Sequence, residues 1–123
     1  MRTFKTIIAV LASAVALSGC CRQPAQLSEH SLFITEADAK IPYRIPAIAA
    51  LSDGSMLALS DYRHCGGDIG FGRVDIHGRT SADNGATWSE EFALIEGTGV
   101  SGAVDCGFGD AAIVADRESD EIL

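Results

Sequence analysis

The sequence predicts an all-β fold of the β-propeller type. Short apolar runs alternate with turn residues along the chain, and 13 of its 123 residues are glycine. No stretch after residue 30 has the period of a helix longer than one turn. Four strands, a long connection and then a further strand are typical of one propeller blade followed by the opening of the next.

Individual strands follow from local patterns. Asp53-Gly54 supplies the positive φ that a tight turn between two strands needs. Residues 73–80 alternate between apolar and polar side chains, which is the period of a half-buried strand. An apolar run at 31–35 predicts an edge or closing strand. The expected blade has strands at 44–51, 56–61, 73–80 and 92–95, and a fifth strand at 110–115 opens the next blade.

Composition excludes some classes of partner. The formal net charge is −8 and the chain contains no basic run, so we expect no nucleic-acid partner. An acidic balance does not exclude an anionic substrate, because a local cationic pocket can lie inside an acidic protein. The three histidines, His30, His64 and His77, lack ligand spacing and suit surface roles. We therefore expect no metal and no cofactor.

The N-terminal segment has the features of an export signal. Arg2 and Lys5 precede an apolar run at 7–17, which is too short to span a membrane as a helix. The next residues, Leu-Ser-Gly-Cys ending at Cys20, resemble a bacterial lipobox. We expect residues 1–20 to be a lipoprotein signal peptide and Cys20 to carry the lipid, with an ordinary secretory signal as the alternative.

Export implies a location and a redox environment. We expect a lipid-anchored protein of the bacterial cell envelope, on either the periplasmic or the surface face, with the membrane as a partner through the anchor. Residues 21–30 would be a polar tether, and 31–123 the beginning of the propeller domain. An exported protein can form disulfides. The sequence nevertheless favours no disulfide between Cys65 and Cys106.

One turn carries a motif of the form S-x-D-x-G-x-T-W, the Asp-box. The Asp83 carboxylate can accept backbone N–H bonds within the turn. Gly85 suits a left-handed conformation that other residues resist, and Trp88 can bury a large ring beside the turn. The motif, with Ser81 as its first residue, indicates a fold and carries no catalytic group.

The order of several short motifs resembles one enzyme family. Tyr43-Arg44-Ile45-Pro46 is followed by Leu51-Ser52-Asp53-Gly54-Ser55, by Asp61-Tyr62-Arg63, by a loop with an aspartate and by the Asp-box. Together they resemble the N-terminal part of the catalytic domain of bacterial sialidases. The resemblance implies a six-bladed propeller of the sialidase type, of which this chain covers about the first one and a half blades.

The resemblance gives Arg44 a role in binding. A guanidinium at the start of a buried strand requires a carboxylate, either the protein's own or a ligand's. In the family this arginine is one of three that hold the carboxylate of sialic acid. Arg63 matches a second arginine that lines the same pocket; the alternative is a salt bridge to Asp61 or Asp68.

Two aspartates complete the expected site. Asp68 is the best match to the family's general acid/base, because it lies in the glycine-containing loop after Arg63. Asp75 is the rival, although its place on a regular strand favours a pair with Arg73 or Arg79. Asp110 resembles an aspartate near the 4-hydroxyl of the sugar, or else is an ordinary carboxylate at the start of a strand.

The implied function is exo-α-sialidase activity, the hydrolysis of terminal sialic acids from glycoconjugates. Sialidases are retaining glycosidases with a tyrosine nucleophile. Tyr43 and Tyr62 lie outside the position that the family uses, so we expect the tyrosine, its glutamate and two further arginines beyond Leu123. The isolated piece is expected to be inactive and not stably folded. The alternatives are a non-catalytic Asp-box propeller that binds glycans or proteins, and a trans-sialidase or related sugar-acid glycosidase.

Overall fold

The computed structural model confirms the all-β prediction. In the part of the chain that it describes, the regular structure consists of β-strands and includes no helix. The described residues are 27–35, 42–66, 71–116 and 118–123.

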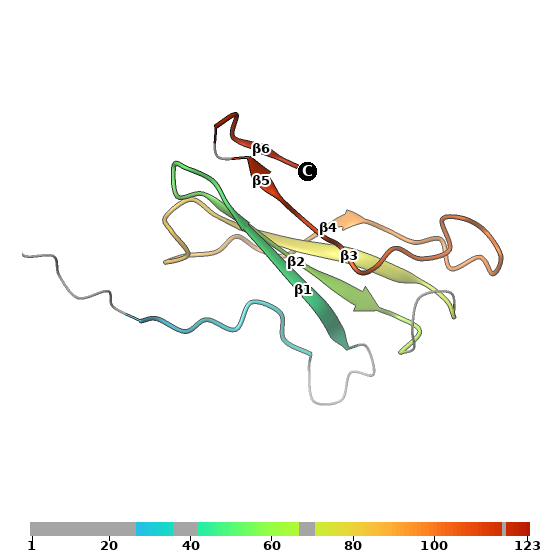
Figure 1. Ribbon diagram of the computed structural model, residues 1–123. Helices are drawn as coiled ribbons and strands as arrows, with labels where there is room; N and C mark the ends of the chain where they lie inside the picture. Colours follow the sequence, from blue (N-terminus) through green and yellow to red (C-terminus); the bar gives the residue numbers. More distant parts are fainter. Residues whose placement is uncertain (1–26, 36–41, 67–70, 117) are drawn as a thin grey trace, which may run out of the picture.

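Four strands form one antiparallel sheet, in which each strand pairs with the next along the chain (Figure 1). This meander is the connectivity of a propeller blade, in agreement with the predicted fold. Two short strands form a separate hairpin, which begins after the long connection. The strands are β1 (Tyr43–Ala50), β2 (Met56–Arg63), β3 (Val74–Ser81), β4 (Phe92–Ile95), β5 (Ala115–Asp116) and β6 (Glu121–Ile122).

Side chains alternate between two faces of the sheet, and strand pairing shows which ones share a face. Arg44 lies opposite Asp61, and Asp61 opposite Ile76, on what we call the site face. Tyr62 lies opposite Asp75 on the other face, which we call the histidine face because it also carries His77. The two faces therefore have different chemistry.

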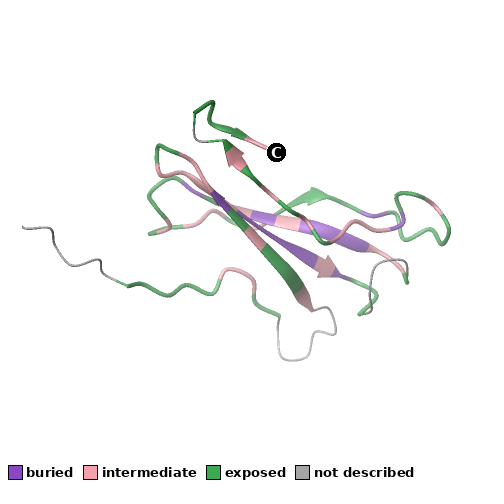
Figure 2. Ribbon diagram, viewed as in Figure 1, coloured by how far each residue is buried: buried purple, intermediate pink, exposed green. Residues whose placement is uncertain are grey.

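The two central strands carry the hydrophobic core (Figure 2). Leu59, Val74 and Ile76 of the site face are only 3%, 0% and 4% exposed. The chain after β4 passes over this face, where the N–H of Asp110 donates to Oδ1 of the Asp61 side chain at 2.9 Å. Burial of one such side chain stabilises the folded state by about 1.5–3 kcal/mol.

Gly78 in the middle of β3 has a packing role. A Cβ at this position would lie 2.8 Å from Cζ of Phe92 and 3.1 Å from Cδ2 of Leu59. The missing side chain therefore leaves room for the ring of Phe92, which extends from the edge strand over the centre of the sheet.

The edge strands expose apolar side chains. Ile48 of β1 is 56% exposed, and Leu94 and Ile95 of β4 are 49% and 43% exposed. Each blade of a propeller packs against the blades on both sides, so exposed apolar groups on both edge strands suit a sheet with neighbours.

Two expected strands differ in the structure. Residues 31–35 form no strand. They contact β1 through a bond from the N–H of Tyr43 to Oγ1 of Thr35 at 3.4 Å, and through the rings of Phe33 and Tyr43, whose centroids are 5.3 Å apart. Of the strand expected at 110–115, only Ala115 lies in β5. Asp110 has a φ of 57°, a left-handed conformation that interrupts a regular extended strand.

The Asp-box is a closed turn held by its own side chains. Asp83 accepts the N–H of Thr87 at 2.8 Å and the Thr87 hydroxyl at 2.7 Å, while the Ser81 hydroxyl donates to it at 2.8 Å. Gly85 has a φ of 82°, and the half-buried ring of Trp88 donates its Nε1–H to the carbonyl of Gly85 at 3.1 Å. The motif thus fixes the connection between β3 and β4.

Asp83 should make stability depend on acid pH. Its hydrogen bonds with Thr87, followed by that from Ser81, lower the pKa of Asp83 from 3.8 to about 2. A folded-state pKa below the unfolded one gives stability that is complete above pH 3.8 and is lost as the pH falls through about 2. In the full-length protein, Asp83→Asn should flatten the fall in unfolding free energy over this range, measured by urea denaturation.

Glu90→Gln provides the control for this measurement. Its side chain accepts no hydrogen bond from any described residue, and it lies close to the same turn. The control should retain the wild-type pH dependence. Equal slopes in Asp83→Asn and the wild type would contradict the role given to the Asp83 carboxylate.

Candidate functional site

Arg44 lies at an irregularity in β1. The pairing of β1 with β2 shifts between Arg44 and Ala47, and Ile45 has a φ of 52°. A positive φ at a β-branched residue is strained, and such strain is concentrated at functional sites. The bulge also places Pro46, which has no N–H to donate, outside the regular ladder.

The Arg44 side chain forms no hydrogen bond or ion pair with any described residue, and Arg44 is exposed. Its backbone is held, since the hydroxyl of Ser60 donates to the Arg44 carbonyl at 2.9 Å. The described protein therefore supplies no carboxylate to Arg44, which leaves its planar set of donors accessible to a ligand.

Beside Arg44 lies a buried ion pair. Asp61 is 0% exposed, and its Oδ2 accepts from Nε of Arg63 at 3.1 Å and from the NH2 nitrogen at 2.8 Å. Arg63 is 2% exposed. The sequence left two interpretations of Arg63 open, a salt bridge and a pocket-lining arginine. The structure contains the salt bridge to Asp61. The position of Arg63 beside Arg44 is also compatible with lining the same pocket.

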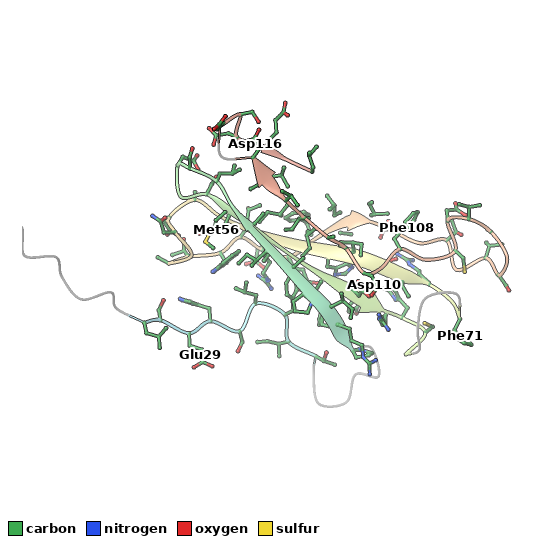
Figure 3. All side chains as sticks on the ribbon, viewed as in Figure 1. Glu29, Met56, Phe71, Phe108, Asp110 and Asp116 are labelled. Atoms are coloured by element: carbon green, nitrogen blue, oxygen red, sulfur yellow. The ribbon has the colours of Figure 1, made fainter. Side chains whose placement is uncertain are left out.

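Asp110, in the connection between β4 and β5, also contacts this ion pair. Its backbone N–H donates to Oδ1 of Asp61 at 2.9 Å, and its carboxylate lies 3.7 Å from Arg63. The Asp110 side chain is 60% exposed (Figure 3 labels this residue). The structure thus brings together Arg44, Arg63 and Asp110 around Asp61, which the sequence indicated only as a possible partner of Arg63.

The sequence contains a pattern that places Asp61 beside Arg63. Asp61 and Arg63 are two residues apart on a strand, so their side chains lie on the same face. The bond to Asp110 spans 49 residues, and no such pattern indicates it.

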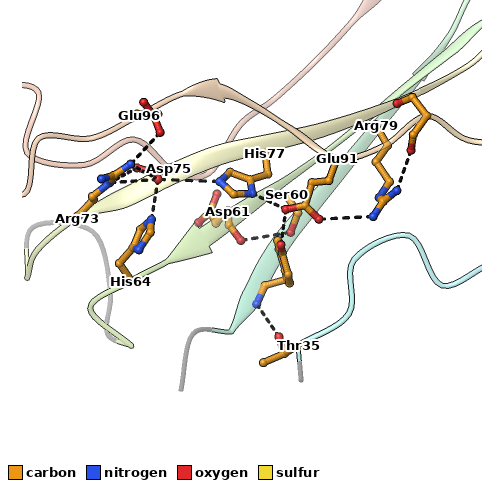
Figure 4. A network of polar contacts seen from close by, with 12 residues as sticks. Thr35, Ser60, Asp61, His64, Arg73, Asp75, His77, Arg79, Glu91 and Glu96 are labelled. Carbon is orange, nitrogen blue, oxygen red and sulfur yellow. Dashed lines mark hydrogen bonds and ion pairs between the residues drawn. The ribbon is translucent and has the colours of Figure 1, made fainter. Parts of the chain in front are cut away.

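The histidine face carries a second polar network (Figure 4). Asp75, 1% exposed, accepts from Nε and NH2 of Arg73 at 2.9 and 2.8 Å and contacts Nε2 of His64 at 2.6 Å. It also accepts the N–H of Gly97 at 2.8 Å. Burial alone would raise the pKa of Asp75, but the bonds from Arg73, His64 and Gly97 outweigh burial and lower it. Asp75 therefore pairs with Arg73, away from Arg44.

The expectation of surface roles for all three histidines is wrong for His77. Its side chain is 14% exposed, its Nδ1 lies 2.6 Å from Glu91, and its ring stacks on Tyr62 at 4.3 Å between centroids. The sequence did not indicate Glu91, which also lies 3.7 Å from Arg79.

Tyr43 belongs to this second network. Its hydroxyl donates to Oε1 of Glu91 at 2.5 Å. Burial, followed by the bond to Glu91, raises the pKa of Tyr43 well above its usual range. Tyr43 and Arg44 are adjacent in a strand and lie on opposite faces. A hydroxyl with a raised pKa on the wrong face is unsuited to attack a substrate held by Arg44.

Removal of the Tyr43 hydroxyl should weaken the fold. Tyr43→Phe leaves Glu91 with one donor fewer, so we expect a loss of about 0.5–1.5 kcal/mol in unfolding free energy, measured by urea denaturation of the full-length protein. Tyr62→Phe is the matched control, because the Tyr62 hydroxyl bonds no described residue. It should change stability by less than about 0.5 kcal/mol. Equal losses in both variants would contradict a stabilising role for the Tyr43 hydroxyl.

A groove of about 480 Å³ lies between the segment at 27–35 and β1. Arg44 is among its lining residues, which are otherwise mostly apolar and include Phe33, Pro46 and Ile48. The groove is an apolar neighbour of the arginine and offers few groups for a polar ligand.

Several expected features lie outside the described residues. Asp68, Cys20, the signal peptide at 1–20 and the first part of the tether belong to this group. In the described chain, Cys65 and Cys106 are not joined by a disulfide. No cluster of three or more potential metal ligands occurs among the described side chains. The ranges that the structure describes hold no helix with the length and apolarity to cross a membrane.

Sequence comparison with known proteins agrees with the geometry. The chain is 32% identical over 106 residues to a sialidase of Paraclostridium sordellii, an alignment that covers 76% of this chain. The chain is a relative of sialidases. It is also 34% identical over 96 residues, or 78% of its length, to a sialidase of Micromonospora viridifaciens. The predicted resemblance to sialidases is confirmed.

The similarity covers a small part of each sialidase. The chain spans 26% of the Paraclostridium protein and 14% of the Micromonospora protein. No family model matches the chain.

Proposed function

We propose that the full-length protein is an exo-α-sialidase that hydrolyses terminal sialic acids from glycoconjugates, and that this chain supplies the first part of its propeller. The observation that carries the proposal is the guanidinium of Arg44, which has no partner among the described residues and lies beside the Asp61–Arg63 pair, in a chain related to sialidases. The two relatives bear the name sialidase, and their similarity to this chain supports the same function here.

The chemistry of the substrate fits this site. Sialic acid carries a carboxylate, and a guanidinium matches a carboxylate through two parallel hydrogen bonds. Arg44 would bind that group, and Arg63 with Asp110 would contact neutral polar groups of the same sugar. The positive charge at Arg44 also offsets the charge of an anionic substrate during attack by a nucleophile.

The proposed mechanism is retaining, with a tyrosine nucleophile. Asp68 would protonate the glycosidic oxygen as the bond to the anomeric carbon breaks. The tyrosine would give its hydroxyl proton to the glutamate as the tyrosine–sugar bond forms. Asp68 would then take a proton from the water that releases sialic acid. We place the tyrosine, its glutamate and two further clamp arginines in later blades, because Tyr43 lies on the other face of this sheet.

The proposal includes a location. A lipid attached to Cys20 would anchor the enzyme to the bacterial cell envelope. Sialylated glycans outside the cytoplasm would then be its partners.

Replacement of Arg44 should test the substrate-binding role. Arg44→Ala removes both hydrogen bonds to the carboxylate, so kcat/KM for a fluorogenic sialoside should fall on the order of 10²-fold or more in the full-length enzyme. Arg44→Lys should recover only part of this loss, because an ammonium group cannot reproduce the planar fork.

Arg79→Lys is the matched control. Arg79 donates to the carbonyl of Ser89 on the histidine face, and its replacement should leave kcat/KM close to the wild type. Unchanged kinetics in Arg44→Ala would contradict the assignment. Sialoside binding without turnover in the wild type would favour a non-catalytic propeller, and transfer of sialic acid to a sugar acceptor would favour a trans-sialidase.

A further inference from the structure

The Asp61 carboxylate connects two parts of the candidate site. Each of its oxygens serves a different segment: Oδ2 accepts two bonds from Arg63 on the same strand, and Oδ1 accepts the N–H of Asp110 from the connection between β4 and β5. The carboxylate is fully buried and uses both of its oxygens. One side chain therefore sets the positions of two others.

The Asp110 backbone needs such an anchor. Its φ of 57° is uncommon for a residue with a side chain and persists only where the surroundings impose it. The N–H bond to Asp61 fixes this conformation and places the Asp110 carboxylate 3.7 Å from the Arg63 guanidinium. The exposed Asp110 carboxylate thus lies against a guanidinium that Asp61 also holds in place.

We propose that Asp61 is a positioning residue for substrate binding, which holds Arg63 and Asp110 as one unit beside Arg44. This inference rests on the proposed function. Asp61 itself is fully buried behind Arg63 and Asp110, so it acts through these two residues.

Asparagine cannot replace Asp61 in this role. Both oxygens of the carboxylate face donors, Arg63 on one side and the Asp110 N–H on the other. An asparagine amide presents an oxygen to one of them and an NH₂ group to the other. In either orientation one contact becomes donor against donor, so the unit is broken.

The test is steady-state kinetics of the full-length enzyme with a fluorogenic sialoside. We expect Asp61→Asn to raise KM about tenfold or more, the loss of roughly one hydrogen bond to a charged group, with kcat within about threefold of the wild type. Glu91→Gln is the control, because Glu91 is also a partly buried carboxylate of this sheet and bonds Tyr43 and His77 on the other face. Its KM should remain at the wild-type value.

A double-mutant cycle separates positioning from general weakening of the fold. Asp110→Gly removes the carboxylate, retains the N–H and tolerates the positive φ. If Asp61 acts through this unit, the effect of Asp61→Asn on KM should be smaller in the Asp110→Gly background than in the wild type. Independent, multiplicative effects would overturn the proposal.

The positioning role of Asp61 can be tested even if Asp61→Asn does not fold. If Asp61→Asn does not fold, as judged by circular dichroism, Asp61→Glu retains the charge but displaces Arg63 by one methylene group, and it should also raise KM. A folded Asp61 variant with wild-type KM would overturn the positioning role. If the wild type itself neither binds nor cleaves the sialoside, the proposed sialidase function is wrong. If Arg44→Ala is impaired while folded Asp61 variants are not, only the positioning role of Asp61 is wrong.

Discussion

The buried pair of Asp61 and Arg63 is the interaction on which the candidate site depends. A charged group inside a protein is tolerated when its partners compensate for the water it has lost, and removal of one partner leaves the other buried and uncompensated. Here the compensation is nearly complete, because Asp61 also accepts the N–H of Asp110. The charge that stabilises Arg63 therefore also places a loop that is distant in sequence.

Side chains of a β-strand alternate between the two faces of the sheet, and the two faces of this sheet differ in their polar contacts. Odd and even positions of β2 point to opposite faces, so Asp61 and Tyr62 enter different surroundings although they are neighbours in sequence. The histidine face satisfies its own charges, with Asp75 and Glu91 as acceptors for Arg73, His64, His77 and Tyr43. The site face has one guanidinium, that of Arg44, without a described partner, and this difference identifies the face on which a ligand is expected.

Local patterns were sufficient to predict most of the sheet. The Asp53-Gly54 turn and the alternation in residues 73–80 predicted strands that the structure contains with ends shifted by one or two residues. Contacts between distant residues were not predictable in the same way. Asp110 looks extended in sequence, but its bond to Asp61 imposes a left-handed conformation. His77 looks like a surface residue of a half-polar strand until Tyr62 and Glu91 are seen to enclose it.

The most direct measurement is a crystal structure of the full-length protein with bound sialic acid. If Arg44 binds the substrate, the sugar carboxylate should accept two hydrogen bonds from the Arg44 guanidinium, with Arg63 and Asp110 against neutral groups of the same sugar. A sialic acid whose carboxylate is held by other residues, far from Arg44, would contradict this role of Arg44.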